Sequence, residues 1–316
     1  MKIFKAYSAG VVAAAKSKRM TTLIYAITFI LALILAIPFH NALSIRAGNS
    51  MALSSMIKHF DYTTYTDFMR QAGKALSPLL AEAFWMGVFY LIFTIFFSGG
   101  VLAVLNEQNN FTIKNFLSGC GKYFFRFLRL AVYMVISEAI ILSLLMFANG
   151  AVLAAAYPSV KTEASLFYIF LIGSIIGILL LILLLSISDY AKIILYRDDS
   201  KKVFKSIWWS IKFLFRHFFG AYTLFLFLLI APVIFFILYF LLDSSIGMVS
   251  GITIFIMFLI QQIFIWLRTW VKIWFLGGEL SYFDMVRQSK IMEAEENPLD
   301  QKDNQSPDIL ESPRTT

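Results

Sequence analysis

Long, uninterrupted apolar runs dominate the chain, and short polar stretches separate them. A helix needs about 20 residues to cross the hydrocarbon core of a bilayer. Each run has about that length or is longer. Continuous runs predict helices rather than the alternating strands of a membrane barrel. The six predicted spans cover residues 21–39, 78–105, 127–149, 166–188, 218–242 and 250–274. The predicted fold is therefore an all-α, polytopic membrane helix bundle, with six transmembrane helices in three hairpins.

Each predicted hairpin is preceded by a basic amphipathic segment. In Val203–Phe218 and Phe111–Arg126 the apolar positions follow the helical spacing i, i+3, i+4, i+7, and residues 3–11 show a shorter version. Such helices lie at the headgroup level on the cytoplasmic face, where Lys and Arg attract anionic lipid. Interfacial anchoring is favoured over recognition of one lipid. The predicted headgroup contacts are Lys114, Lys122, Arg126, Lys201, Lys202, Lys205, Lys212 and Arg216.

Lys and Arg concentrate before the first span and after the second and fourth. Because cytoplasmic segments carry the excess of positive charge, the multi-pass protein is predicted to have both termini in the cytoplasm. Loop 40–77 also carries basic residues, but long loops translocate with less regard for charge, so it is predicted to lie outside. Apolar spacing within 53–60 and 65–76 predicts two short helices there.

Residues 1–285 are predicted to form one membrane domain built on a repeat of about 90 residues. Lys122–Arg126 matches Lys212–Arg216 at an offset of 90 residues, and Phe97–Leu102 matches Phe275–Leu280 at about twice that offset. The predicted repeat units are 1–105, 106–196 and 197–285.

The amino-acid composition indicates a lipid environment and a positively charged membrane domain. The chain is 59% apolar and only 15% charged, whereas soluble domains average about 25% charged residues. Residues 286–316 differ, because they are acidic, contain three prolines and predict a disordered cytoplasmic tail. Residues 1–285 hold 23 basic and 12 acidic residues, a net charge of +11. The predicted partner is a lipid bilayer with anionic lipids, with a membrane protein as a second candidate and no nucleic acid.

Reactive groups are few. The single cysteine, Cys120, allows no intramolecular disulfide, and the three histidines lack metal-ligand spacing. The sequence contains no phosphate-binding loop, nucleophile elbow or dinucleotide fingerprint. No catalytic residue, metal or cofactor is therefore predicted, and the chain is not expected to be an enzyme.

Glu138 is the candidate intramembrane polar site. It lies nine residues after Arg129, about 13 Å along a helix, near the middle of the third span. Carboxyl groups at this depth usually face the bundle interior with a partner. Gln261 and Gln262, near the middle of the sixth span, are the predicted partners. A neutral, hydrogen-bonded structural carboxyl is favoured over a proton or cation site.

Other span residues predict packing and anchoring. Pairs of small residues predict close contacts between helices of one monomer, and these pairs are Ala83/Gly87, Gly99/Ala103, Gly173/Gly177 and Gly247/Gly251. Arg268 and Lys272, one turn apart near the inner end of the sixth span, are predicted to extend to the interface. Trp266, Trp270 and Trp274 share another face and predict an interfacial belt.

The amphipathic segments Phe111–Arg126 and Val203–Phe218, the Gly99-Gly100 exit and the long first outer loop carry a resemblance. The chain resembles poorly characterised bacterial six-span membrane proteins and the membrane region that accompanies some glycerophosphodiester phosphodiesterases. This resemblance covers most of residues 1–285. The phosphodiesterase catalytic domain is absent, so its activity and site residues are not carried over. The resemblance implies a bacterial inner-membrane protein without known enzymatic activity.

Two functions are consistent with the sequence. The favoured one is a non-enzymatic integral membrane protein that organises, senses or helps to assemble membrane components through its basic cytoplasmic face. The alternative is a transporter or channel for a small solute or lipid, supported by Glu138, Pro232 and the repeat. Many transporters line interrupted helices with polar groups, and these spans have few.

Overall fold

The computed structural model describes residues 2–47, 60–107, 111–160, 162–246 and 250–296, and every regular element in these ranges is a helix. The elements are α1 (Lys2–Lys16), α2 (Lys18–Ala47), α4 (Tyr62–Asn106), α5 (Ile113–Ala156), the 3₁₀ turn η1 (Tyr157–Ser159), α6 (Glu163–Arg197), α7 (Val203–Arg216), α8 (Phe218–Ser245) and α9 (Gly251–Glu296). Six of them, α2, α4, α5, α6, α8 and α9, are long and apolar enough to cross a membrane. The all-helical fold with six candidate spans is therefore confirmed.

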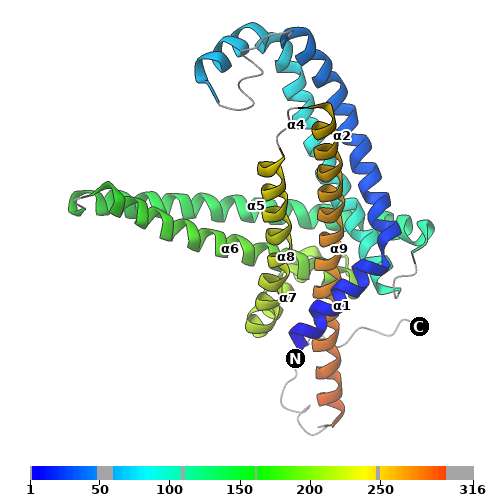
Figure 1. Cartoon of the computed structure of the whole chain (residues 1–316). Helices are drawn as coiled ribbons and strands as arrows, with labels where there is room; N and C mark the ends of the chain where they lie inside the picture. Colours follow the sequence, from blue (N-terminus) through cyan, green and yellow to red (C-terminus); the bar gives the residue numbers. More distant parts are fainter. Residues whose placement is uncertain (1, 48–59, 108–110, 161, 247–249, 297–316) are drawn as a thin grey trace.

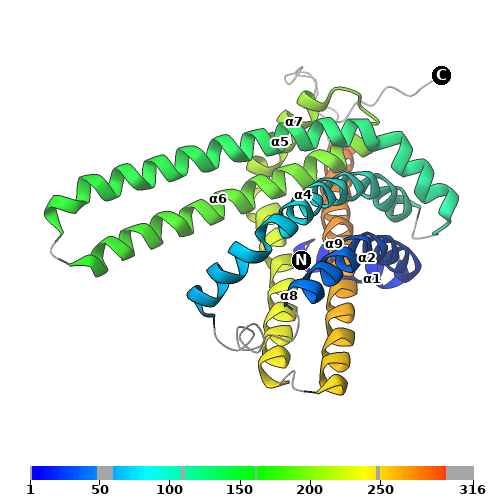
Figure 2. The same cartoon turned by 90° about the horizontal axis from the view of Figure 1, so that it is seen from above.

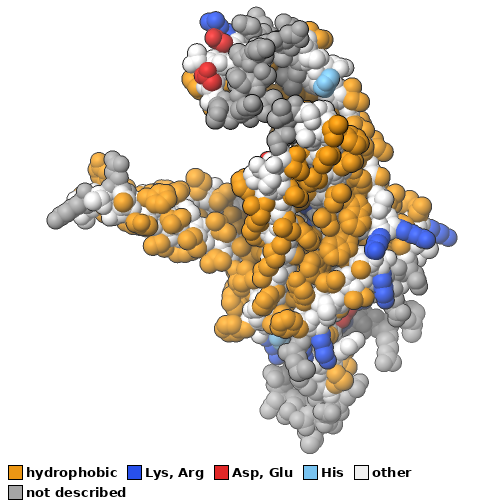
Figure 3. Space-filling view, in the orientation of Figure 1, with side chains coloured by type: hydrophobic (Ala, Val, Ile, Leu, Met, Phe, Trp, Pro, Cys, Tyr) orange, Lys and Arg blue, Asp and Glu red, His pale blue; other side chains and the backbone are white. Residues whose placement is uncertain are grey.

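The long helices lie in consecutive pairs: α2 packs against α4, α5 against α6, and α8 against α9. Their outer faces carry large hydrophobic side chains that the protein itself does not cover, as Figure 3 shows. Phe147 on α5, for example, is 77% exposed, and Phe236 on α8 is 60% exposed. Apolar surface of this extent is expected where the solvent is lipid rather than water.

The three pairs diverge from one another. In Figures 1 and 2, α5 and α6 extend together to one side, across the direction of α8 and α9. Lipid tails provide no hydrophobic force that would draw the apolar lengths of the pairs together. The pairs are therefore held mainly at a common junction.

The ends of α4 and α6 meet α9 at this junction. Arg197, at the end of α6, donates hydrogen bonds to the side chains of Asn106 in α4 and Asp284 in α9. Along the chain, Asn106 and Arg197 lie 91 residues apart, and Arg197 and Asp284 lie 87 apart. These spacings are close to the predicted repeat of about 90 residues.

Around the junction, α4 packs on the start of α5, α6 on α7, and α9 on α1. Small side chains allow each approach. A Cβ atom added at Gly119 would lie 2.9 Å from the Gly99 carbonyl oxygen, and one added at Gly10 would lie 2.8 Å from the Gly278 nitrogen. Ser210 of α7 donates to a backbone carbonyl of α6 over 2.6 Å. The second helix of each pair thus contacts the start of another pair. Helix α4 contacts α5 itself, whereas α6 and α9 contact α7 and α1, the short helices that precede α8 and α2.

Two predicted helices have different boundaries. Residues 65–76 form no separate helix, because α4 runs unbroken through them into the second span. Segment 53–60 lies almost wholly outside the described residues. Segment 111–126 likewise continues into the third span as α5. The buried stripe of α5 runs without a break from Phe116 to Met134, so no interruption separates its amphipathic start from the span.

The predicted tail also begins later than expected. Helix α9 continues through Glu296, so residues 286–296 are helical rather than disordered. Val286 is buried, and Arg287 pairs with Asp198 at 3.2 Å. These contacts stabilise the extension, and residues 297–316 lie outside the described part of the chain.

Two of the three tryptophans of α9 donate hydrogen bonds to α1 and α2, and the third packs against one of them. Trp274 is buried and donates its indole N–H to the Tyr7 carbonyl at 3.2 Å. Trp270 packs against Trp274, and Trp266 donates to the Thr22 hydroxyl at 3.2 Å. Their apolar area therefore serves contacts within the protein.

Candidate functional site

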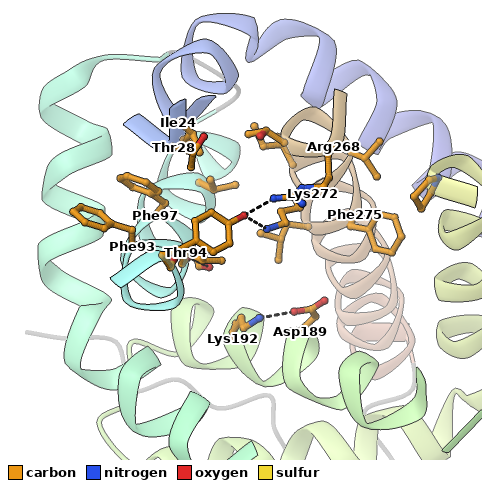
Figure 4. A pocket seen from close by; sticks show the side chains of 18 residues that line it. Ile24, Thr28, Phe93, Thr94, Phe97, Asp189, Lys192, Arg268, Lys272 and Phe275 are labelled. Atoms are coloured by element: carbon orange, nitrogen blue, oxygen red, sulfur yellow. Dashed lines mark hydrogen bonds and ion pairs between the residues drawn. The ribbon is translucent and has the colours of Figure 1, made fainter. Parts of the chain in front are cut away.

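A cavity of about 370 Å³ lies beside the junction, between residues of α2, α4, α6, α8 and α9. Phe93, Phe97 and Phe275 form part of its apolar wall. Its charged and phenolic groups are Tyr90, Asp189, Lys192, Arg268 and Lys272. With three cations and one carboxylate at its surface, we call this cavity the cationic pocket (Figure 4).

Arg268 and Lys272 both point toward Tyr90. The Arg268 guanidinium donates to the Tyr90 hydroxyl oxygen at 2.9 Å, and the Lys272 ammonium lies 3.4 Å from the same oxygen. Among the described residues, neither cation forms an ion pair with a carboxylate. Two positive charges thus converge on one neutral phenol, an arrangement that favours an anion nearby.

Lys192 and Asp189 form the other side of the pocket, and Figure 4 shows both on α6. The Lys192 ammonium lies 2.6 Å from an Asp189 carboxylate oxygen. About a quarter of the Lys192 side chain is exposed (26%), and it lines the cavity. Because Asp189 is already paired with Lys192, it does not neutralise the charges of Arg268 and Lys272.

Glu279 lies behind this ion pair and is fully buried. It interacts electrostatically with Lys192 and Asp189. Neither of its carboxylate oxygens has a hydrogen-bond partner among the described residues. Glu138 of α5 also interacts electrostatically with Lys192 and Asp189. Lys192 is therefore the cation shared by carboxyl groups of α5, α6 and α9.

The predicted pairing of Glu138 with Gln261 and Gln262 is wrong, because both amides have other partners. The Gln261 amide nitrogen donates to the Tyr239 hydroxyl at 3.3 Å. The Gln262 side-chain oxygen accepts a hydrogen bond from the Tyr25 hydroxyl at 2.9 Å. Here α9 packs between α8 and α2, while α5 packs along α6, so the charges of α6 become the neighbours of Glu138.

The predicted headgroup residues fall into two groups. Six are exposed, namely Lys114, Lys201, Lys202, Lys205, Lys212 and Arg216. Lys122 is exposed as well, but it and Arg126 bind the Asp199 carboxylate at 3.0 and 2.5 Å. Burial acts to raise the pKa of Asp199, but hydrogen bonds from Lys122 and Arg126 outweigh it and lower that pKa. These two cations therefore join α5 to the turn between α6 and α7.

No protein-family model, curated protein or solved structure matches this chain. The resemblance to the membrane region of phosphodiesterases therefore stays a prediction.

Sequence reasoning missed the cationic pocket as a unit. It treated Arg268 and Lys272 as interfacial anchors and counted Lys192 only among the basic residues that follow the fourth span. It gave Glu279 only a place in the repeat motif. The available signal was that all four charges lie within helices that are long and apolar enough to cross a membrane. Their convergence depends on how α4, α6 and α9 meet, which no local pattern contains.

Proposed function

We propose that this chain is a non-enzymatic integral membrane protein that binds an anionic membrane component in the cationic pocket. The observation that carries the proposal is that Arg268 and Lys272 converge on Tyr90 without a carboxylate partner among the described residues. Arginine and lysine donate charge-assisted hydrogen bonds to carboxylate or phosphate oxygens, and an apolar surrounding strengthens them. Binding of this kind suits a protein that organises, senses or helps to assemble membrane components.

The proposed placement is three membrane hairpins with both termini cytoplasmic, in the cell's inner (plasma) membrane. This placement requires α5 and α6, which run across α8 and α9 in the structure, to align with them in the bilayer. Helix α7 supports an interfacial position, because Phe204 and Trp208 are 74% and 63% exposed while Lys205 is exposed beside them. The cyclic contacts of α4 with α5, α6 with α7 and α9 with α1 support three repeat units. In this placement the junction lies on the cytoplasmic side.

Cysteine labelling tests this orientation. In a Cys120→Ser background, Ser159→Cys and Ser245→Cys variants are expected to react with a membrane-impermeant thiol reagent in intact cells, because both positions lie at the outer ends of hairpins. A Ser200→Cys variant, at the α6–α7 turn, should react only after permeabilisation. The reverse pattern would place the junction outside.

Ligand titration tests the pocket itself. In a neutral maltoside detergent, dodecyl phosphate is expected to raise the thermal unfolding midpoint of the wild type, because a ligand of the folded state stabilises it. Arg268→Gln/Lys272→Gln should weaken binding by about 100-fold, since each charge-assisted bond contributes about 1.5–3 kcal/mol.

The matched control is Lys16→Gln/Lys18→Gln, which removes two exposed charges away from the pocket. It should keep wild-type affinity. An Arg268→Gln/Lys272→Gln variant that binds dodecyl phosphate as tightly as this control would contradict the proposal.

A transporter or channel for a small solute or lipid is the second candidate. The observation that favours it is the buried Glu279 beside Lys192 and Asp189. Carboxyl groups of membrane spans often belong to ion or proton pathways. Transport would additionally require the pocket to open to both sides of the membrane.

A further inference from the structure

An apolar groove lies beside the cationic pocket and is formed by α2, α4 and α9. It has a volume of about 500 Å³, and its apolar lining includes Phe29, Ala32, Ala36, Ala83, Gly87 and Phe258. Thr28, Tyr90, Arg268 and Thr269 line both the groove and the pocket. The two spaces are therefore adjacent, and Arg268, which is hydrogen-bonded to Tyr90, is one of the residues that they share.

Small residues keep the groove open. The pair Ala83/Gly87 was predicted to make a close helix contact, yet a Cβ atom added at Gly87 would meet nothing within 4 Å. By contrast, a Cβ atom added at Gly99 would lie 2.7 Å from the Gly119 carbonyl oxygen and 3.2 Å from the Tyr123 Cβ. The polar groups Tyr25 and Gln262 of the groove bond to each other at 2.9 Å, which leaves an apolar channel.

The depth of the basic end fits the cytoplasmic leaflet in the proposed orientation. Arg268 lies 17 residues after Gly251, the outer end of α9, so about 26 Å along the helix. A hydrocarbon core is about 30 Å thick, which places Arg268 near its cytoplasmic boundary. From Thr28 to Ala36 the groove follows α2 for about 12 Å, away from the cytoplasmic end of that helix in the proposed orientation. A lipid of the inner leaflet has this same order of headgroup and chain.

The basic pocket and the apolar groove are together complementary to a molecule with a phosphate group and an acyl chain. The Arg268 fork and the Lys272 ammonium can transfer their hydrogen bonds from Tyr90 to phosphate oxygens, and the Tyr90 hydroxyl can donate a third. The groove can then remove an acyl chain from contact with the rest of the bilayer. A free phosphate would use only the pocket and leave the groove without a role.

We infer that the ligand is an anionic phospholipid of the cytoplasmic leaflet, with its phosphate in the cationic pocket and one acyl chain in the apolar groove. This inference rests on the proposed function, which requires only that the pocket binds an anion. It adds that the groove binds an acyl chain, and that the protein therefore selects a long-chain lipid over other anions.

A variant that fills the groove tests the inference. Gly87→Leu places a side chain in the groove without a backbone clash, and Gly150→Leu adds the same side chain at an equally open site on α5. Binding of dioleoylphosphatidylglycerol and of its dihexanoyl analogue is measured for each purified protein by native mass spectrometry. Gly87→Leu is expected to weaken binding of the long-chain lipid at least about tenfold and to leave the short-chain lipid unchanged. Gly150→Leu should change neither.

Ala83→Leu, in the same groove, repeats the test at a second position, and dihexanoyl lipid binding reports that each variant is folded. If long-chain binding survives both groove variants but is lost in Arg268→Gln/Lys272→Gln, the groove assignment is wrong and the pocket stands. If the pocket variant also binds both lipids normally, the proposed function fails as well.

Discussion

Gly119→Leu is expected to leave little folded protein. A Cβ atom at this position would lie 2.5 Å from the Ala103 Cβ and 2.9 Å from the Gly99 carbonyl oxygen. The second contact is with backbone, so relief requires α4 and α5 to separate at the junction. Overpacking typically costs about 1–3 kcal/mol even where side chains can adjust, and here the backbone must move. Size-exclusion chromatography and the thermal unfolding midpoint in detergent measure the loss.

Gly121→Leu is the matched control, since a Cβ atom there meets nothing within 4 Å on the same helix. It should elute and unfold like the wild type. If Gly119→Leu behaves like Gly121→Leu, the close packing of α4 on α5 does not hold the protein together.

Lys192→Met is expected to produce the second large loss of stability. Lys192 binds Asp189 at 2.6 Å and interacts electrostatically with Glu279 and Glu138. Methionine keeps the length and apolar stem but leaves these carboxyl groups without their shared cation. Removing one partner of a fully buried pair typically costs about 3–5 kcal/mol, but Lys192 and Asp189 are 26% and 21% exposed, which reduces the cost. The free energy of unfolding in detergent mixtures, measured by sodium dodecyl sulfate titration, should fall by about 1–3 kcal/mol.

A control and a rescue define this effect. Lys205→Met, at an exposed position of α7, should cost far less. Adding Asp189→Asn and Glu279→Gln to Lys192→Met removes two unpaired acids and should restore much of the stability. A Lys192→Met variant as stable as Lys205→Met would show that the buried charges do not depend on this lysine.

The sequence predicted the six apolar helices because each span is a local property of about 20 consecutive residues. The short opening helices α1 and α7 were also visible, since their apolar spacing is local. The break expected after residue 126 is absent because Phe116, Cys120, Tyr123 and Phe127 continue one buried stripe into the span. The sequence pattern was interpreted one segment at a time, so it divided α5 into an amphipathic segment and a span, whereas packing keeps α5 one continuous helix.

The candidate site was less predictable, because it depends on contacts between residues far apart in the chain. Arg268 and Tyr90 are separated by 178 residues, and their hydrogen bond requires α4 and α9 to pass beside each other. The Ala83/Gly87 pair has the spacing of a helix contact, yet it lines a groove. Small residues allow both outcomes, and only the direction of the neighbouring helices decides between them.

The most direct test of the cationic pocket is the lipid that the protein retains from a bilayer. Wild type and Arg268→Gln/Lys272→Gln are reconstituted in equal parts phosphatidylglycerol and phosphatidylcholine, released from nanodiscs and weighed by native mass spectrometry. We predict that the wild type retains one phosphatidylglycerol, that the variant retains none, and that neither retains phosphatidylcholine. Equal retention of phosphatidylglycerol by both proteins, or equal retention of the two lipids by the wild type, would contradict an anion-binding pocket.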